Sequence, residues 1–384
     1  MIIKRTLKLM PLLQKKSFFL FGPRGTGKSY LIRQELSATI PIINLLRSEH
    51  YLRLMNRPQD LESIINSYED HSIVVIDEVQ RIPLLLNEVH RLIEENHIKF
   101  LLTGSSARKL KRGGANLLAG RAREAKLFPL TYHEIEMFDL KRYLLYGGLP
   151  SIYLSDEPQE DLYAYIDTYL KEEIIAEAVV LKLQAFTRFL EISAITSGTM
   201  LNYANLSNDV GISASTIREY YGILEDTFLG FSVPAYTKTI KRKAISTAKF
   251  YYFDLGIKNV LAKIDGVPEN TDIFGNLFEH FMALELRAYL SYRRIRKSLC
   301  YWQSKNGQEV DFVIGDDIAL EVKSSNNIQD KHLKGLKALA EENLCKKYIL
   351  VSQDTINRNK DNINILYWKD FLTRLWADEI IDTK

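Results

Sequence analysis

The chain has 384 residues, enough for two or three domains, and its 46% hydrophobic and 26% charged residues exclude a disordered chain. With 51 basic and 48 acidic residues the net charge is only +3, so local clusters of charge must indicate any partner. Cys300 and Cys345 lack the spacing of a zinc site, and Pro11 interrupts the apolar core that a signal peptide needs. Since no later run is long enough to span a bilayer, we expect a cytoplasmic protein without a membrane partner.

Five short apolar runs alternate with polar, helix-like stretches between Ser17 and Glu134. This alternation is typical of a parallel β-sheet with crossover helices, and strands covered on both faces are rich in Val, Ile, Leu and Phe. The runs are SFFLF, PIINLL, SIVVID, KFLLTG and EAKLFPL. The sequence therefore predicts an α/β nucleotide-binding core over residues 1–150.

The pattern of apolar residues in the sequence changes twice after this core. Beyond Gly147, Gly148 and Pro150, apolar and Tyr residues recur at intervals of three and four, which predicts a helical domain over residues 151–249. From Phe250 the strand-like runs YYF, CYW, EVDFVI and IALEVK appear among helices. They predict a separate α/β domain over residues 250–384.

The segment FFLFGPRGTGKSYLIRQEL places a glycine-rich loop between an apolar strand and an amphipathic helix and matches the phosphate-loop pattern GxxxxGK[ST]. Glycines let backbone N–H groups curl around phosphate oxygens, and the helix N-terminus adds its positive end. Lys28 would reach the β and γ phosphates of ATP, and Ser29 would bind Mg²⁺ through its hydroxyl. The predicted ATP-binding residues are Gly22, Pro23, Arg24, Gly25, Thr26, Gly27, Lys28 and Ser29.

Two carboxylates, Asp77 and Glu78, follow four apolar residues at 73–76. They would lie at the carboxyl end of a buried strand, where open α/β sheets bind their ligands. We expect Asp77 to hold Mg²⁺ and Glu78 to orient and polarise the attacking water. An ordinary strand followed by a solvated acidic turn is the alternative.

The next strand ends in Thr103 and Ser105, whose hydroxyls are candidates to touch the γ-phosphate or the water. Capping of the following helix is the alternative role. Basic residues then crowd the stretch 108–126, which suits an arginine finger, a nucleic-acid contact or a solvated loop. Arg121 is the first candidate for the finger.

A family resemblance emerges from the order of these motifs: GPRGTGKS, VVIDEVQRIP, LLTGSSARKL, LAGRAREAKLFPLTYHEIE and YGGLP. They resemble the prokaryotic AAA+ ATPases that carry a characteristic C-terminal domain of unknown function. GNLFEHFMALEL, GQEVDFVI and IALEVKSS are similar to the C-terminal signatures of that group, so the resemblance covers nearly the whole chain. It implies an AAA+ P-loop ATPase domain, a helical middle with a winged-helix unit, and an end similar to PD-(D/E)xK nuclease folds.

Residues 201–231 predict two helices around a tight turn at Gly211, with Ser213 as the N-cap of the second helix. Residues 215–218 would lie at the start of that helix, where DNA-reading side chains usually sit. The stretch 236–249 is basic without an acid and suits a wing against phosphate, although winged helices also serve as packing units. Its basic residues are Lys238, Lys241, Arg242, Lys243 and Lys249.

Asp311 and Glu321 would sit on neighbouring strands, with Lys323 on the face of Glu321 because strand side chains alternate. In the PD-(D/E)xK pattern the two carboxylates share a divalent metal and the lysine acts on the nucleophile. Glu279, on an apolar helix, completes a predicted metal site of Glu279, Asp311 and Glu321. Inert strand carboxylates are the alternative. A basic flank available to DNA consists of Arg287, Arg293, Arg294, Arg296 and Lys297.

Three hypotheses follow. The first is a Mg²⁺-dependent ATPase whose nucleotide state controls DNA binding and DNA cleavage by the C-terminal domain. The second is an ATP-dependent regulator of a protein partner, in which the nuclease-like domain is inactive, and the third is a nucleotide switch with little turnover. The intact Glu78 disfavours the third, and the basic stretches favour the first over the second. A homo-oligomer is compatible with each.

Overall fold

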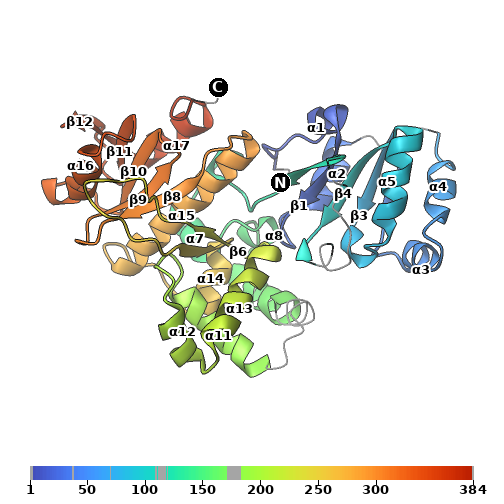
Figure 1. Cartoon of the computed structure of the whole chain (residues 1–384), viewed down its shortest axis with the longest axis horizontal. Helices are drawn as coiled ribbons and strands as arrows, with labels where there is room; N and C mark the ends of the chain where they lie inside the picture. Colours follow the sequence, from blue (N-terminus) through green and yellow to red (C-terminus); the bar gives the residue numbers. More distant parts are fainter. Residues whose placement is uncertain are drawn as a thin grey trace.

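The computed structural model describes residues 3–36, 39–69, 71–108, 110, 118, 120–170 and 183–382. Figure 1 shows three parts: a parallel sheet flanked by helices, a group of helices below it, and a second sheet at the opposite end. The chain visits them in that order. Among the described helices, none is long and apolar enough to cross a membrane.

The first part is a five-stranded sheet in the order β2-β3-β4-β1-β5, in which every pair is parallel. Residues alternate along β1, so that Phe19 and Phe21 enter one apolar cluster and Phe18 and Leu20 the other. All five predicted strands are confirmed: β1 (Ser17–Phe21), β2 (Ile42–Asn44), β3 (Ile73–Asp77), β4 (Lys99–Gly104) and β5 (Ala122–Lys126). The helices here are α1 (Met10–Lys15), α2 (Lys28–Glu35), α3 (Ser48–Asn56), α4 (Asp60–Ile65) and α5 (Leu85–Asn96), with the 3₁₀ turns η1 (Val79–Arg81) and η2 (Tyr132–Glu134).

The middle part is helical, as predicted, and its core is rich in edge-to-face aromatic contacts such as that of Phe189 with Tyr221. Its helices are α7 (Leu140–Tyr146), α8 (Pro150–Tyr153), α9 (Pro158–Tyr165), the π-helix η3 (Ile166–Leu170), α11 (Leu183–Ile195), α12 (Tyr203–Val210), α13 (Ala214–Asp226) and α14 (Leu255–Leu261). Residues 171–182 of the predicted helical domain lie outside the described residues.

The predicted pair of helices around Gly211 is confirmed. Gly211 ends α12 in the left-handed conformation with φ 78°, and the Ser213 side chain caps α13 by accepting the Thr216 N–H at 3.2 Å. A two-stranded antiparallel ribbon follows, made of β6 (Gly230–Val233) and β7 (Lys249–Tyr252). The predicted domain boundary at 249/250 falls inside β7.

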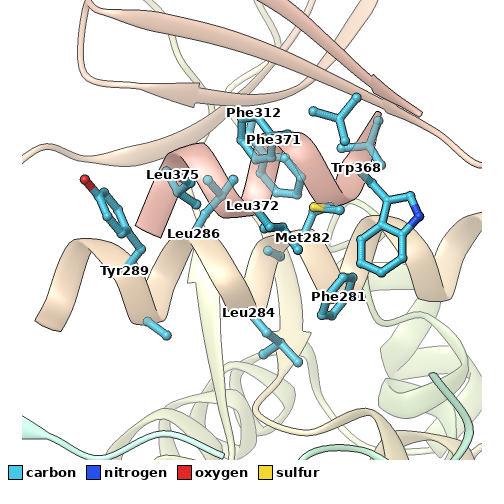
Figure 2. Close-up of a cluster of buried hydrophobic side chains, with 14 of the residues drawn as sticks. Phe281, Met282, Leu284, Leu286, Tyr289, Phe312, Trp368, Phe371, Leu372 and Leu375 are labelled. Carbon is cyan, nitrogen blue, oxygen red and sulfur yellow. The ribbon is translucent and has the colours of Figure 1, made fainter. Parts of the chain in front are cut away.

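The third part is a mixed six-stranded sheet in the order β12-β13-β11-β10-β9-β8. The 21-residue helix α15 and the C-terminal α17 pack against each other, and Figure 2 shows the side chains of Met282 and Leu286 facing those of Phe371, Leu372 and Leu375. The elements are α15 (Asp272–Tyr292), β8 (Leu299–Gln303), β9 (Glu309–Ile314), β10 (Ile318–Lys323), η4 (Asp330–Leu333), α16 (Lys334–Ala340), β11 (Lys347–Ser352), β12 (Arg358–Lys360), β13 (Ile363–Tyr367) and α17 (Trp368–Trp376).

The buried carboxylate of Asp254 ties the turn between α7 and α8 to the start of α14. It accepts the Gly148 N–H at 2.8 Å and caps α14 through the Gly256 N–H at 2.9 Å. Burial raises the pKa of Asp254 to about 6, because these N–H groups only partly replace water. Gly147 packs directly on this carboxylate: a Cβ atom there would lie 2.0 Å from Asp254 Oδ1. The glycine pair of YGGLP is therefore required by close approach.

Gly147→Ala should destabilise the protein far more than Gly211→Ala, although the two glycines have nearly equal φ angles of +76° and +78°. A Cβ at Gly211 would meet nothing within 4 Å, so its cost is the backbone strain of about 1–2 kcal/mol. Gly147→Ala adds overpacking against Asp254, roughly 1–3 kcal/mol more. Urea unfolding followed by circular dichroism measures both, and equal losses would contradict this account.

Candidate functional site

The predicted phosphate loop connects β1 to α2, which begins at Lys28. Gly25 and Gly27 have φ angles of +81° and +90°, which favour glycine, and a Cβ at Gly22 would lie 2.4 Å from the Leu127 carbonyl oxygen. The Lys28 ammonium donates to the carbonyl oxygens of Gly22 at 2.6 Å and Pro23 at 3.0 Å. The loop is thus shaped around its own lysine.

The two predicted carboxylates lie beside this loop, at the end of β3. Ser29 Oγ donates to Asp77 Oδ2 at 3.1 Å, which brings together the two oxygen groups predicted to hold Mg²⁺. Glu78 has the left-handed conformation (φ 64°, ψ 44°), uncommon for a residue other than glycine. The turn directs Glu78 toward the loop, and its carboxylate lines the same pocket as Lys28 and Ser29.

Both predicted hydroxyl residues contact this acidic pair. Thr103 Oγ1 donates to Asp77 Oδ1 and accepts the Glu78 N–H at 3.0 Å, so it positions both residues. The Gln80 amide donates to the Glu78 carboxylate and, at 3.1 Å, to Ser105 Oγ. Gln80 was not among the predicted site residues, and its place two residues after Glu78 was the available signal.

Lys28, Ser29 and Glu78 line a pocket of about 530 Å³. The phosphate loop forms one wall, and α8 supplies another through Pro150, Ser151 and Leu154. The Tyr165 hydroxyl of α9 donates to the Arg24 carbonyl at 3.0 Å, so the helical part also contacts the back of the loop. Residues from two parts of the chain therefore enclose one site.

Residues 14–136 match the family model described as an AAA domain, and this match together with the loop geometry decides the identity of the first part. It is an AAA-type, ATP-binding ATPase domain. Residues 137–267 and 274–371 match two models described as domains of unknown function, DUF8612 and DUF4143. Their descriptions support neither the winged-helix nor the nuclease-like assignment.

Relatives align over most of the chain. An uncharacterized protein of Haemophilus influenzae is 24% identical, with 91% of this chain and 92% of that protein covered. Two uncharacterized proteins of Methanocaldococcus jannaschii are 24% and 23% identical, over 94% and 97% of this chain and 85% and 91% of theirs.

Similar solved structures include a Walker-type ATPase of Pyrococcus abyssi, with 14% identity, a TM-score of 0.40, and 65% of this chain and 92% of that one covered. AMPPCP-bound DnaA from Aquifex aeolicus has 11% identity and a TM-score of 0.28, with 56% and 84% covered.

A buried arginine that sequence reasoning missed joins the phosphate loop to the C-terminal part. Arg5 donates to the Thr26 carbonyl at 2.7 Å and the Phe128 carbonyl at 2.6 Å, and its Nε lies 3.1 Å from Glu134 Oε1. Burial alone would lower the pKa of Arg5, but Glu134 outweighs it and raises this pKa. Arg5 also lies 3.3 Å from the hydroxyl of Tyr292, at the end of α15.

The position of Glu134, three residues after Thr131, could have been recognised in the sequence. Thr131 and Glu134 form a capping-box pattern, and Glu134 Oε2 accepts the Thr131 N–H at 3.1 Å. Nothing in the local sequence around Arg5 or Tyr292 indicates their contact, because the two residues are 287 positions apart.

Arg121 does not join the ATP pocket of its own chain. It precedes β5, whose last residue, Lys126, pairs with Phe21 immediately before the phosphate loop. Since the strands are parallel, Arg121 lies at the opposite end of the sheet, where it forms an ion pair with Glu94 of α5. A role as arginine finger would therefore require a second copy of the chain, and it stays a prediction.

The C-terminal carboxylates converge around two lysines. Lys323 contacts Glu321 and lies 3.9 Å from Asp311 Oδ2, and Asp311 accepts the Val322 N–H at 2.7 Å. The predicted placement of these three side chains on one face of β9 and β10 is confirmed. Burial raises the pKa of Glu321 well above its usual value, and Oε2 of this carboxylate has no hydrogen-bond partner.

Glu279 projects from α15 toward the same place but meets a different lysine. Lys249 of β7 lies 3.2 Å from Glu279 and 2.7 Å from Glu309, and the Tyr251 hydroxyl donates to Glu279 at 2.7 Å. Burial lowers the Lys249 pKa, but Glu279, Asp311 and Glu309 outweigh it and raise this pKa. Lys249 was predicted to lie on a phosphate-facing wing.

The predicted metal site of Glu279, Asp311 and Glu321 is not assembled. Across the part of the chain that the structure describes, no group of three or more His, Cys, Asp or Glu side chains is arranged to hold a metal ion. Two ammonium groups stand between the carboxylates instead, and they supply the neutralisation that a cation would otherwise provide. The carboxylates are therefore paired with lysines in this structure, and a metal site at Glu279, Asp311 and Glu321 stays a prediction.

The wing prediction also needs correction. The segment between β6 and β7 lies against the C-terminal sheet, where Glu342 accepts the N–H groups of residues 240–242. Lys238 pairs with Asp316 at 2.7 Å and Arg242 with Glu341 at 2.7 Å, while the Lys241 ammonium donates to the Glu341 carbonyl. These ion pairs hold two parts of the chain together. The basic run has no acid nearby in the sequence, but acidic residues that are distant in the sequence lie next to it in the folded protein.

Lys249→Met should destabilise the protein more than Lys323→Met. Both remove a cation from buried carboxylates, at a typical cost of about 3–5 kcal/mol for a buried pair. The Lys249 side chain is 5% exposed against 34% for Lys323, so water replaces the second ammonium more easily. Thermal unfolding compares the two, and Glu279→Gln should restore part of the loss in the Lys249 variant. The reverse order of stabilities would contradict the burial argument.

Proposed function

We propose that the chain hydrolyses ATP with Mg²⁺ and that its nucleotide state acts, through α15, on DNA bound by the C-terminal half. The observation that carries this proposal is the chain of contacts from the phosphate loop through Arg5 to Tyr292. An ATP pocket built on a loop that is hydrogen-bonded to the next domain is suited to transmit its state.

The residues of the pocket fit the parts of a phosphoryl-transfer site. Lys28 would bind the β and γ phosphates, and the oxygens of Ser29 and Asp77, 3.1 Å apart, would hold Mg²⁺. When bound, Mg²⁺ neutralises charge on the transferred phosphate. Glu78 would orient the attacking water, held by its contacts with Thr103 and Gln80.

Coupling follows from the length and stiffness of α15. Tyr292 accepts the Phe128 N–H at 3.1 Å beside the phosphate loop, whereas Glu279 lies in the lysine–carboxylate cluster thirteen residues earlier. At 1.5 Å per residue these ends are about 20 Å apart. A displacement of the loop by nucleotide would therefore reach the C-terminal sheet along one continuous helix.

A protein partner is the second candidate for the effector side. It is favoured by the pairing of Lys238, Arg242 and Lys249 with acids of the chain, which removes cations that a DNA-facing wing needs. DNA stays the first candidate because Arg123, Arg294 and Arg296 form no ion pair within the described part of the chain.

Glu78→Gln should keep ATP binding and lose turnover, because only the water-positioning carboxylate changes. A general base of this kind contributes about 10²–10⁴-fold to the rate. Phosphate release measures turnover, and calorimetry measures affinity. Lys28→Ala is the matched variant that should instead lose affinity for ATP. Full turnover by the Glu78 variant would remove Glu78 from its proposed role.

Tyr292→Phe should uncouple the two halves without emptying the ATP pocket, because it removes only the hydroxyl that meets Arg5 and the Phe128 N–H. In a Glu78→Gln background, ATP should slow hydrogen exchange in α15 and β9. Adding Tyr292→Phe should abolish this effect. The Kd for ATP should change less than about fivefold, which is the smallest change in affinity that allosteric coupling typically produces.

Tyr289→Phe is the matched control for this experiment. It removes a hydroxyl from the same helix whose partner is Asp378, away from the phosphate loop. Unchanged ATP-dependent protection in the Tyr292 variant would overturn the proposed route, and loss of protection in both variants would show a general loosening of α15.

A further inference from the structure

A groove of about 350 Å³ runs between the edge strand β5 and the second half of α15, where the AAA domain meets the C-terminal part. Leu7, Leu290 and Ile295 give it an apolar floor. Its polar lining consists of Glu124, Lys126, Arg287, Ser291, Arg294 and Arg296. Cations thus come to one groove from two domains that are far apart in the sequence.

The arginines at this groove lack acidic partners. In the described part of the chain, neither Arg123 of β5 nor Arg294 or Arg296 forms an ion pair, whereas their neighbours Arg293 and Lys297 pair with Asp378 and Asp317 at 2.6 Å. Burial, then Arg123 and Arg296, lower the pKa of Arg294. These like charges repel one another, and Glu124 is the one acid in the lining.

Arg287 lines the groove and is held by aromatic rings. Its guanidinium carbon lies 4.0 Å from the Phe231 ring centroid and 5.1 Å from that of Phe128. Burial lowers the pKa of Arg287 to about 10, so it stays charged at neutral pH. The stacked rings fix its orientation while the edge of the guanidinium remains available to an anion.

We propose that this groove binds the phosphodiester backbone of DNA. The inference rests on the proposed DNA-directed function and moves its contact surface from the wing to the boundary between the AAA domain and α15. Arg287, Arg294 and Arg296 bring planar, multiply donating guanidinium groups to a single groove, which suits phosphate oxygens. Lys126 adds an ammonium group to the lining, and Arg123 lies close enough to Arg294 to lower its pKa. An acidic polypeptide is the competing occupant.

The place of the groove gives it a route to the ATP site. Lys126 pairs with Phe21, the residue before the phosphate loop, and Arg287 also lines a small space beneath Gly22 and Pro23. On the other wall, α15 ends at Tyr292, the contact of Arg5. Phosphate bound there would hold together the elements that surround the nucleotide.

The test measures the salt dependence of binding of a fluorescent 20-mer DNA, single-stranded and duplex, by anisotropy. The variant carries Arg123→Gln, Arg294→Gln and Arg296→Gln, three side chains outside the ATP pocket. Its matched control, Lys305→Gln with Lys331→Gln and Lys334→Gln, removes the same charge from the C-terminal part away from the groove. The groove variant should lower the log–log salt slope by about two to three units, since each phosphate contact contributes roughly 0.9 on duplex and 0.7 on single strands.

The outcomes separate the groove from the function on which it rests. Normal DNA binding by the control, with a reduced slope in the groove variant and unchanged basal ATP turnover in both, supports the proposal. A parental slope in the groove variant overturns the groove while DNA binding stands. No DNA binding by the parent protein overturns both, and displacement of DNA by polyglutamate at equal charge would assign the groove to an acidic protein.

Discussion

The buried ion pair of Arg5 with Glu134 holds the C-terminal part against the phosphate loop. A guanidinium removed from water is stable only when carbonyl, carboxylate or hydroxyl oxygens accept its hydrogen bonds. The groups that contact Arg5 belong to Thr26, Phe128, Glu134 and Tyr292. These partners belong to the phosphate loop, the segment after β5, the 3₁₀ turn η2 and α15. One buried charge thereby fixes the position of a C-terminal helix relative to the nucleotide pocket.

Buried charge also organises the C-terminal part. Carboxylates from α15, β9 and β10 approach one another closely enough to require neutralisation, and the cations come from β7 and from β10 itself. The β7 lysine belongs to the middle part of the chain. This cluster therefore fastens the middle part to the C-terminal sheet. The helix α15 is thus held at Glu279 by an ion pair with Lys249 and at Tyr292 by a hydrogen bond with Arg5.

Charges that are paired within the chain indicate internal packing, whereas unpaired charges at a surface indicate a binding partner. The basic residues of 236–249 are mostly neutralised by acids of the C-terminal sheet, so they report on internal packing. Arg123, Arg294 and Arg296 lie near one another without an ion pair in the residues that the structure describes, and their mutual repulsion costs stability. Repulsion between unpaired arginines at a surface is a stronger indication of a binding partner than the number of basic residues in a stretch of sequence.

The sequence predicts the features that depend on neighbouring residues. The strand, glycine loop and helix around Lys28, the carboxylates at the end of β3 and the turn at Gly211 follow from local periodicity and backbone conformation, and all are present. It also placed Asp311, Glu321 and Lys323 on one face, because adjacent strands with a period of two leave little choice. The strands β11 and β13 were missed although KYILVS and INILY are apolar runs.

Which charges meet depends on the fold. Lys249 is buried and pairs with Glu279 and Glu309. Arg121 pairs with Glu94 at the end of β5 that is opposite the phosphate loop. Arg5 contacts Tyr292, which is 287 positions away in the sequence. Pairing energies depend on distance in space and on burial, and neither is encoded in the spacing of residues along the chain. The sequence thus specified the chemistry of the ATP site, whereas the fold determined what that site is connected to.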